Sequence, residues 1–199
     1  MTIIMSATPS RKEISHDRIV EAASRAVRRA GYQGVGVADV MKEAGLTHGG
    51  FYAHFESRDA LLVEAVQRAG RDNAAVLGER IAQRRAEGEP PLAALVNAYL
   101  NDQQLASTEH GCVVAALASE MPRQDAALLD ASRTRVLGLV DAVRRVLPRD
   151  ADAGEAGVIA ATMVGALQLA RTLGGKAGKS LLASTRQTLL SRHAPPRRA

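Results

Sequence analysis

Apolar residues recur at intervals of three and four along most of this chain, the spacing that places them on one face of an α-helix. The pattern predicts a first helix over residues 15–30, a short second helix over 37–44 and a third over 48–55. A longer fourth helix is expected over residues 58–87. Prolines fall between the periodic segments and not inside them, as expected at helix ends. These features predict an all-α protein.

The rest of the chain continues in the same way, with helical segments separated by short polar stretches that contain glycine or proline. Alanine, the strongest helix former, occurs 37 times, and residues that favour strands are sparse. No internal repeat is visible. Further helices are expected over residues 91–106, 111–120, 124–147, 152–173 and 179–192.

The second and third predicted helices are joined by a sequence typical of a helix-turn-helix. In Gly45-Leu46-Thr47, glycine can take the left-handed conformation that ends a helix, and leucine can pack into the core. Threonine is a good cap for the next helix, and Ser57 is expected to cap the fourth in the same way. The first part of the chain is therefore expected to fold as a small helix-turn-helix domain.

Three of the five aromatic residues, Phe51, Tyr52 and Phe55, lie within five positions, directly after Gly49 and Gly50. Because Phe51 and Phe55 are four residues apart, they share a face and are expected to fix the third helix onto the first two. Tyr52 then points elsewhere. Each glycine weakens a helix by roughly 1 kcal/mol relative to alanine, but lets the backbone approach DNA and leaves amides open to a phosphate. The alternative is an ordinary loop.

Residues 11 to 62 resemble the DNA-binding domain of the TetR family of bacterial transcriptional regulators. The likeness lies in a helix ending in AGYQG, a helix reading VADVMKEAGL and the segment THGGFYAHFESRDALL. It implies a homodimeric regulator that binds a palindromic operator and responds to a small-molecule inducer. Repression is the usual role in the family, and activation is the alternative. By the same resemblance, phosphate contacts are expected from Thr47, Tyr52, His54 and Arg58, and groove-facing positions at His48, Gly49 and Gly50.

Two positions depart from the pattern of the family. Gly36 stands where threonine or serine usually caps the second helix and touches the DNA backbone, so that side-chain contact is lost. Arg58 stands where lysine is commoner; its guanidinium keeps the charge and can bind a phosphate through two N–H groups. The expected division is a DNA-binding domain over residues 11–57, a ligand-binding and dimerisation domain over 58–194, and flexible termini at 1–10 and 195–199.

The last two predicted helices carry small and apolar residues suited to close helix packing, such as Val158, Gly165 and Leu169 in one and Leu182 and Leu189 in the other. In the resembling family, the last two helices pair across a two-fold axis. The alternative is a core within one chain.

Candidate ligand contacts are polar or soft side chains that interrupt the apolar helices of the larger domain. Because aromatic residues are few, the pocket is expected to be aliphatic, which favours a small aliphatic or reactive inducer over a flat aromatic one. The candidates are Tyr99, Gln103, His110, Cys112, Met121, Met163 and Gln168.

Cys112 is the single cysteine, which excludes an internal disulfide. It is interpreted either as a buried structural residue or as a thiol at a helix start whose reaction with an electrophile or oxidant releases DNA. No cluster of cysteines and histidines completes a metal site, and GGKAGKS lacks the spacing and the preceding strand of a phosphate-binding loop. Neither a cofactor, a metal nor an enzymatic activity is expected.

Charge and hydropathy change this picture little. The formal net charge of +5 is compatible with a nucleic-acid partner and equally with an ordinary basic protein. No apolar run approaches the roughly 20 residues that span a bilayer, and the N-terminus lacks the pattern of a signal peptide. A soluble, cytoplasmic protein is expected.

Overall fold

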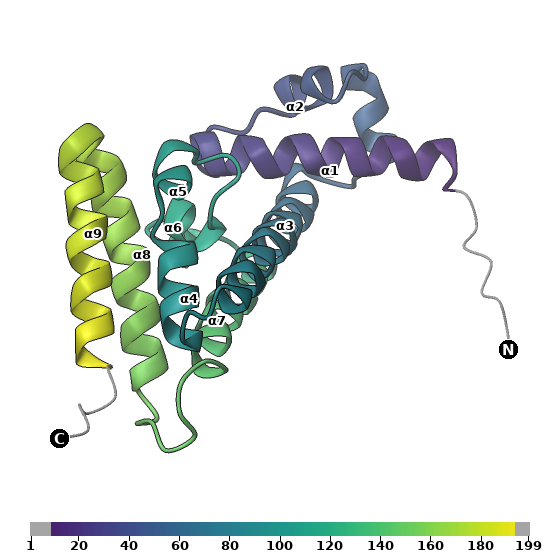
Figure 1. The fold of residues 1–199 in the computed structure, drawn as a ribbon. Coiled ribbons are helices and arrows are strands. Elements are labelled where there is room, and N and C mark those ends of the chain that lie inside the picture. The colour runs from purple at the N-terminus through teal and green to yellow at the C-terminus, as the bar shows by residue number, and fades with distance from the viewer. Residues whose placement is uncertain (1–8, 194–199) are drawn as a thin grey trace, which may run out of the picture.

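The computed structural model describes residues 9–193, and this part of the chain contains helices and no strands (Figure 1). The predicted all-α class is confirmed. The N-terminal elements are α1 (Arg11–Ala30), α2 (Val37–Glu43), the 3-10 helix η1 (His48–Ala53) and the long α3 (Arg58–Ala86). They are followed by α4 (Pro91–Tyr99), α5 (Asp102–Ala106), α6 (Val113–Leu117), the 3-10 helix η2 (Met121–Arg123), α7 (Ala126–Arg144), α8 (Glu155–Leu173) and α9 (Gly175–Arg192).

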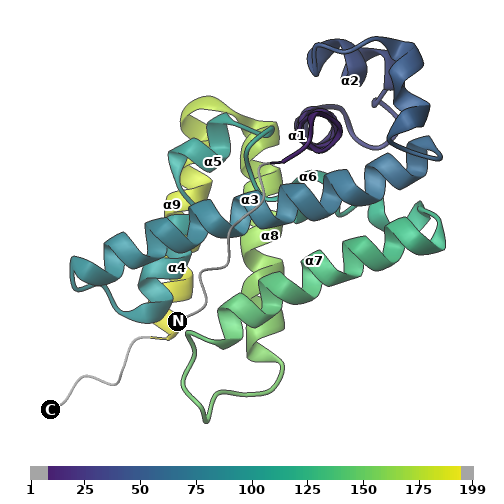
Figure 2. The same cartoon turned by 90° about the vertical axis from the view of Figure 1, so that its right-hand side faces the viewer.

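The long helix α3 joins two parts of the molecule. At its start it packs against α1, which lies across one end of the structure with α2 beyond it (Figure 1). Farther along, α3 packs against α4 and α7, and Figure 2 shows α3 and α7 running side by side. The neighbouring helices α8 and α9 form a pair on the flank of this larger part. A displacement of α3 would therefore move the N-terminal helices relative to the rest.

Helix α1 begins earlier than the apolar pattern predicts, because a capping box fixes its first turn. The Ser10 side chain accepts a hydrogen bond from the backbone N–H of Glu13 at 3.2 Å. In return, the Glu13 carboxylate accepts one from the backbone N–H of Ser10 at 2.6 Å. The charged residues of this turn do not contribute to the apolar periodicity, so the pattern alone placed the start at residue 15.

The single helix expected over residues 91–106 is wrong, because the chain breaks after Tyr99. Asn101 caps a new helix, α5, by accepting a hydrogen bond from the backbone N–H of Gln104 at 2.9 Å. The helix expected over 111–120 is likewise shorter, since α6 spans five residues and a separate 3-10 turn follows it. Asparagine caps and short turns interrupt helices without disturbing the apolar spacing, which explains both errors.

The apolar residues of α8 and α9 divide between the core and the outer surface. Leu182 and Leu189 are buried within the chain, so for these two residues the interpretation as intramolecular core is the right one. On α8, by contrast, Val158 and Leu169 are 63% and 61% exposed, and nothing lies near the open side of Gly165. The outer face of α8 is thus left without a partner in the described part of the chain.

Helix α8 also corrects the expectation that no segment is long and apolar enough to cross a membrane. By length and composition alone it could do so. In this fold, however, α8 packs against α6, α7 and α9, and residues such as Ile159, Met163 and Leu167 are buried among them. That packing of its inner face is what is expected of a helix that covers a globular core.

Candidate nucleic-acid interface and its connection to the larger domain

The third helix of the helix-turn-helix is a 3-10 helix instead of the expected α-helix. Its backbone begins with a hydrogen bond from the N–H of Gly50 to the carbonyl of Thr47, at 3.1 Å. The Thr47 side chain makes no capping hydrogen bond, so the predicted cap is wrong, whereas Ser57 caps α3 as expected. The exposed Thr47 hydroxyl is therefore available to a partner outside the domain.

Phe51 and Phe55 fix this element to the domain, as predicted. Both are buried, and their rings stack with centroids 5.6 Å apart. His16 of α1 extends the stack, with its ring centroid 4.6 Å from that of Phe55. These contacts hold one face of η1 against α1 and leave the other face outward.

The outward face carries Tyr52, which is 75% exposed, together with the exposed His48 and Gly49. Neither glycine of the tandem pair has a positive φ, in contrast to Gly45 in the preceding turn, whose φ is +69°. A Cβ at Gly49 would meet nothing within 4 Å, and one at Gly50 would make only ordinary contacts. The fold itself therefore does not require glycine at these two positions.

The start of α2 differs from the pattern of the resembling family, as expected from Gly36. Gly36 occupies the N-cap position without a side-chain hydrogen bond. The Asp39 carboxylate lies over it, with Oδ2 2.9 Å from where a Cβ would be. The Asp39 carboxylate thus occupies the space that a threonine or serine side chain at position 36 would fill.

His54 is half-buried beside α1. Its Nδ1 is buried and has no hydrogen-bond partner in the described part of the chain, and its ring centroid lies 6.0 Å from that of His16. Loss of solvent, with smaller effects from His16 and Lys12, lowers the pKa of His54 below its usual value. At neutral pH the His54 ring is therefore uncharged.

Arg58 makes contacts that the sequence did not suggest. Its Nε donates to the carbonyl of Val35 at 3.0 Å, and its Nη2 donates to the carbonyl of Tyr32. Its Nη1 lies 3.6 Å from the Asp59 carboxylate. Arg58 thus holds the loop between α1 and α2 against the start of α3, and only its remaining N–H groups are free for the predicted phosphate contact.

Two basic residues beside the turn were missed by the sequence analysis. Arg18 of α1 and Lys42 of α2 are exposed, and neither forms an ion pair within residues 9–193. The Arg18 guanidinium lies over Gly45, 2.6 Å from where a Cβ would be. The signal for Arg18 was a basic residue directly before the apolar Ile19 and Val20, at the edge of the apolar face of the helix. Both side chains are candidates for phosphate contacts.

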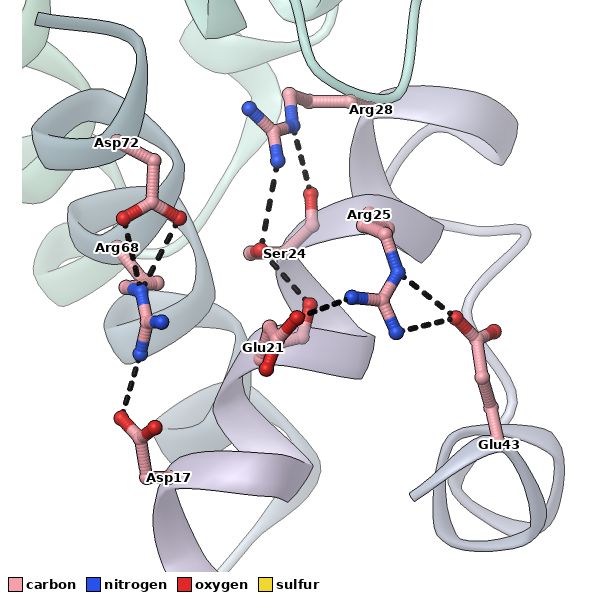
Figure 3. Close-up of polar contacts among 8 residues, drawn as sticks. All are labelled: Asp17, Glu21, Ser24, Arg25, Arg28, Glu43, Arg68 and Asp72. Atoms are coloured by element: carbon pink, nitrogen blue, oxygen red, sulfur yellow. Dashed lines mark hydrogen bonds and ion pairs between the residues drawn. The ribbon is translucent and has the colours of Figure 1, made fainter. Parts of the chain in front are cut away.

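Ion pairs tie the N-terminal helices together and to α3 (Figure 3). Arg25 of α1 pairs with Glu21 at 2.6 Å and with Glu43, the last residue of α2, at 3.0 Å. Arg68 of α3 pairs with Asp72 at 2.9 Å and reaches Asp17 of α1 at 2.5 Å. The helix-turn-helix is thereby fastened to α3 as one unit.

A second connection joins α1 to the segment before α6. Arg28 is buried, donates from Nε to the carbonyl of Ser24 at 2.9 Å (Figure 3), and donates from Nη1 to the carbonyl of Gly111 at 3.3 Å. Burial lowers the pKa of Arg28 to about 10, so it remains charged at neutral pH. The Tyr32 hydroxyl also lies 3.1 Å from that of Ser132 on α7. The end of α1 is therefore in direct contact with the larger domain.

The seven candidate ligand contacts do not line one cavity. Tyr99, Met121 and Met163 are buried, Gln168 is half-buried and His110 is exposed. Gln103 lines a surface cavity beside α3 and accepts a hydrogen bond from Arg80, whereas Met121 lines a separate apolar cavity beside α7.

Of the seven, Cys112 lines a cavity of about 250 Å³ enclosed by α3, the start of α6 and α7. The thiol is 3% exposed, and the buried hydroxyl of Tyr99 lies close to it without a hydrogen-bond partner in the described chain. Asn73 and Arg135 also line this cavity. The sequence pattern gives no sign of either residue, because helices distant in the sequence bring them together.

Comparison with known proteins supports the interpretation of the helix-turn-helix. The family model described as bacterial regulatory proteins, tetR family, matches residues 19–65. The HTH-type transcriptional regulator BetI of Escherichia coli (strain K12) is 29% identical over 186 residues, covering 92% of each chain.

Among solved structures, a TetR-family transcriptional regulator from Agrobacterium tumefaciens has a TM-score of 0.74 at 21% identity, over 93% of this chain and 100% of its own. The reduced form of E. coli NemR has a TM-score of 0.74 at 18% identity, over 92% and 99% of the two chains. These two structures share the fold with this chain.

In this structure η1 presents one face outward, and the helix-turn-helix to which it belongs is attached to a larger helical domain. This arrangement is typical of helix-turn-helix DNA-binding proteins. The family model over residues 19–65, the likeness to BetI over nearly the whole length and the shared fold together support a bacterial transcriptional regulator of the TetR family. The relatives named above are regulators and not enzymes.

Proposed function

We propose that this regulator is a dimeric repressor that binds a palindromic operator and is released from it by a small molecule. In this proposal His48, Gly49 and Gly50 face the major groove, and Thr47 and Tyr52 contact phosphates. The observation that supports it is the presence of glycine at both positions 49 and 50, although neither the backbone conformation nor the packing requires glycine there. Close approach to DNA supplies a reason for both. Such a protein would act in the cytoplasm, where bacterial DNA lies.

Dimerisation through α8 fits the exposed residues of that helix. Val158, Leu169 and Leu173 are all more than half exposed, and Gly165 leaves room for close approach of another helix. Exposed apolar residues that gather on one helix are typical of an interface. A two-fold dimer would also present two helix-turn-helix units to the two halves of a palindrome.

DNA binding is tested by variants that separate reading of bases from contact with phosphates. Tyr52→Phe is expected to weaken binding to all sequences alike, by about tenfold, because one phosphate hydrogen bond is lost. His48→Ala is expected to change the preference among operator variants. Arg18→Ala and Lys42→Ala are each expected to lower the slope of log affinity against log salt by about one. Fluorescence anisotropy with labelled operator over a salt series measures all four.

Arg58→Ala belongs to the same series, with thermal stability as a second measurement. A phosphate contact predicts a salt slope lower by about one, whereas the bonds to Tyr32 and Val35 predict a loss of stability alone. Arg133→Ala on α7 is the control, since among residues 9–193 Arg133 pairs only with Asp130, at the surface. If wild-type protein binds operator and random DNA equally, the protein does not read the groove as proposed.

A thiol-based sensor is the alternative, and the position of Cys112 on a cavity wall favours it. In that case the Cys112 thiol adds across an activated carbon–carbon double bond: the sulfur bonds to one carbon, the π bond breaks, and the other carbon takes up a proton in place of the one that the thiol loses. The adduct then releases the operator. N-ethylmaleimide is then expected to release operator from wild-type protein but not from Cys112→Ser. A thiol that is labelled only after unfolding would instead support a structural role and leave a non-covalent inducer.

A further inference from the structure

The charged residues that line the cavity between α3, α6 and α7 are all positive. Leu77, Val113 and Leu139 give it an apolar surface, while Arg135 and Arg145 are its charged residues. No aspartate or glutamate lines it in the part of the chain that the structure describes. A cationic ligand would therefore meet repulsion without compensation, and an anionic one would meet attraction.

Arg135 is half-buried and lacks a partner for its charge among residues 9–193. Its side chain crosses the face of Gly70, where a Cβ would collide with the Arg135 Cδ, so glycine at this position on α3 makes room for it. The Nε of Arg135 is buried and has no hydrogen-bond partner, and no carboxylate pairs with its guanidinium among residues 9–193. A buried donor without a partner is costly, which favours a site that a ligand completes.

Further positive charge lies behind the cavity wall formed by Cys112. Arg171 donates from Nη2 and Nε to the carbonyl of Gln104, at 2.9 and 3.2 Å, and its Nη1 is buried without a partner in the described chain. The buried Arg28 likewise bonds to neutral oxygens. The nearby carboxylates of Asp72 and Glu109 are already paired with Arg68 and Arg29. This side of the domain is thus short of negative charge.

We propose that the inducer is a small monocarboxylate with an aliphatic body. This proposal rests on the repressor function proposed above. Arg135 binds the carboxylate, and the aliphatic part lies against Leu77, Val113 and Leu139. The volume of about 250 Å³ is below the range of roughly 300–1,000 Å³ typical of drug-sized ligands, so the body is short.

Binding at this place also explains how release from DNA would follow. The cavity wall at Cys112 and Val113 adjoins Gly111, whose carbonyl accepts the hydrogen bond from Arg28 of α1. The opposite wall belongs to α3, which carries the helix-turn-helix through Arg68 and Asp17. A ligand that separates these two walls therefore shifts both contacts that hold α1: Arg28 with Gly111, and Asp17 with Arg68.

The experiment compares molecules of equal length that differ in one group: hexanoate, hexanamide, 1-hexanol and hexylamine, with butyrate and octanoate as further carboxylates. At least one carboxylate is expected to raise the melting temperature and to release labelled operator, and the three other hexyl compounds are not. Arg135→Gln is expected to weaken carboxylate binding about tenfold to hundredfold, because a charge-assisted hydrogen bond is lost. Its affinity for operator should stay at the wild-type value.

Two matched variants control for surface charge and folding. Arg133→Gln, two residues away on α7 and paired with Asp130 at the surface, should bind carboxylate normally. Arg135→Lys keeps the charge and should retain part of the affinity.

If no carboxylate binds, if the alcohol or amine binds equally well, or if Arg135→Gln keeps full affinity, the anionic inducer is wrong. Operator binding by the same samples would then leave the repressor function intact. Conversely, carboxylate binding through Arg135 by a protein that does not recognise an operator would contradict the proposed function and support the anion site.

Discussion

Leu169→Glu is expected to turn a dimer into a monomer and to weaken operator binding by more than about a hundredfold. The Leu169 side chain is 61% exposed on the outer face of α8, beside the open side of Gly165. In a two-fold interface the substitution is present in both protomers, so two glutamates would be buried close together. Burying these like charges costs several kcal/mol. A monomer also loses the gain of roughly 10² to 10⁴ that comes from binding two half-sites at once. Light scattering gives the mass, and anisotropy gives the affinity.

The matched control for this variant is Leu137→Glu on α7. Leu137 is 62% exposed, almost the same as Leu169, but lies outside α8 and α9. This variant should remain a dimer and should bind operator with the wild-type affinity. A wild-type protein that is monomeric at tens of micromolar would contradict the dimer, as would a Leu169→Glu variant that keeps its mass.

The helix-turn-helix could be predicted from the sequence because its determinants are local. Gly45 in the turn, the Ser57 cap and the phenylalanines four residues apart all act within a few positions, and the structure has each of them as expected. The prediction failed where a local signal was ambiguous. Threonine at position 47 is a good cap in an α-helix, but the chain forms a 3-10 helix there and the hydroxyl is left free.

The break between α4 and α5 shows a different limit. Apolar residues continue across residues 91–106 with helical spacing, so the pattern contains no sign of an interruption. Only the side chain of Asn101, which accepts from Gln104 and donates to the carbonyl of Ala98 at 2.6 Å, ends one helix and starts the next. Apolar periodicity reports which face is buried, and side-chain capping decides where a helix stops.

The cavity could not be predicted from the sequence at all. Gly70, Cys112 and Arg135 come from three separate helical segments and meet only through the packing of α3 against α7. The candidate contacts chosen from the sequence were polar residues within apolar stretches, and most of these proved to be either core or surface. Arg58 illustrates the same point, since its charge is visible in the sequence but the carbonyls of Tyr32 and Val35 that it binds are not.

Phe51→Ala is expected to destabilise the N-terminal domain by roughly 3–5 kcal/mol, the usual cost of removing a large buried ring. The Phe51 ring is 1% exposed and stacks on Phe55, so its loss leaves a cavity under η1. Operator binding should fall with it, because η1 is then no longer held against α1. Urea unfolding followed by circular dichroism measures the stability, and the same samples serve for the operator assay.

Tyr52→Ala removes the neighbouring ring and is expected to lower the affinity for operator while leaving the stability almost unchanged. Because Tyr52 is 75% exposed, the change in stability should stay within about 0.5 kcal/mol. Its affinity for operator should nevertheless fall at least tenfold, since the phosphate contact and the ring are both lost. The two variants differ by one position along the chain and test the two faces of η1 separately.

A stability loss below about 1 kcal/mol for Phe51→Ala would show that the ring does not hold η1 in place. Wild-type operator affinity for Tyr52→Ala would place that face of η1 away from the DNA.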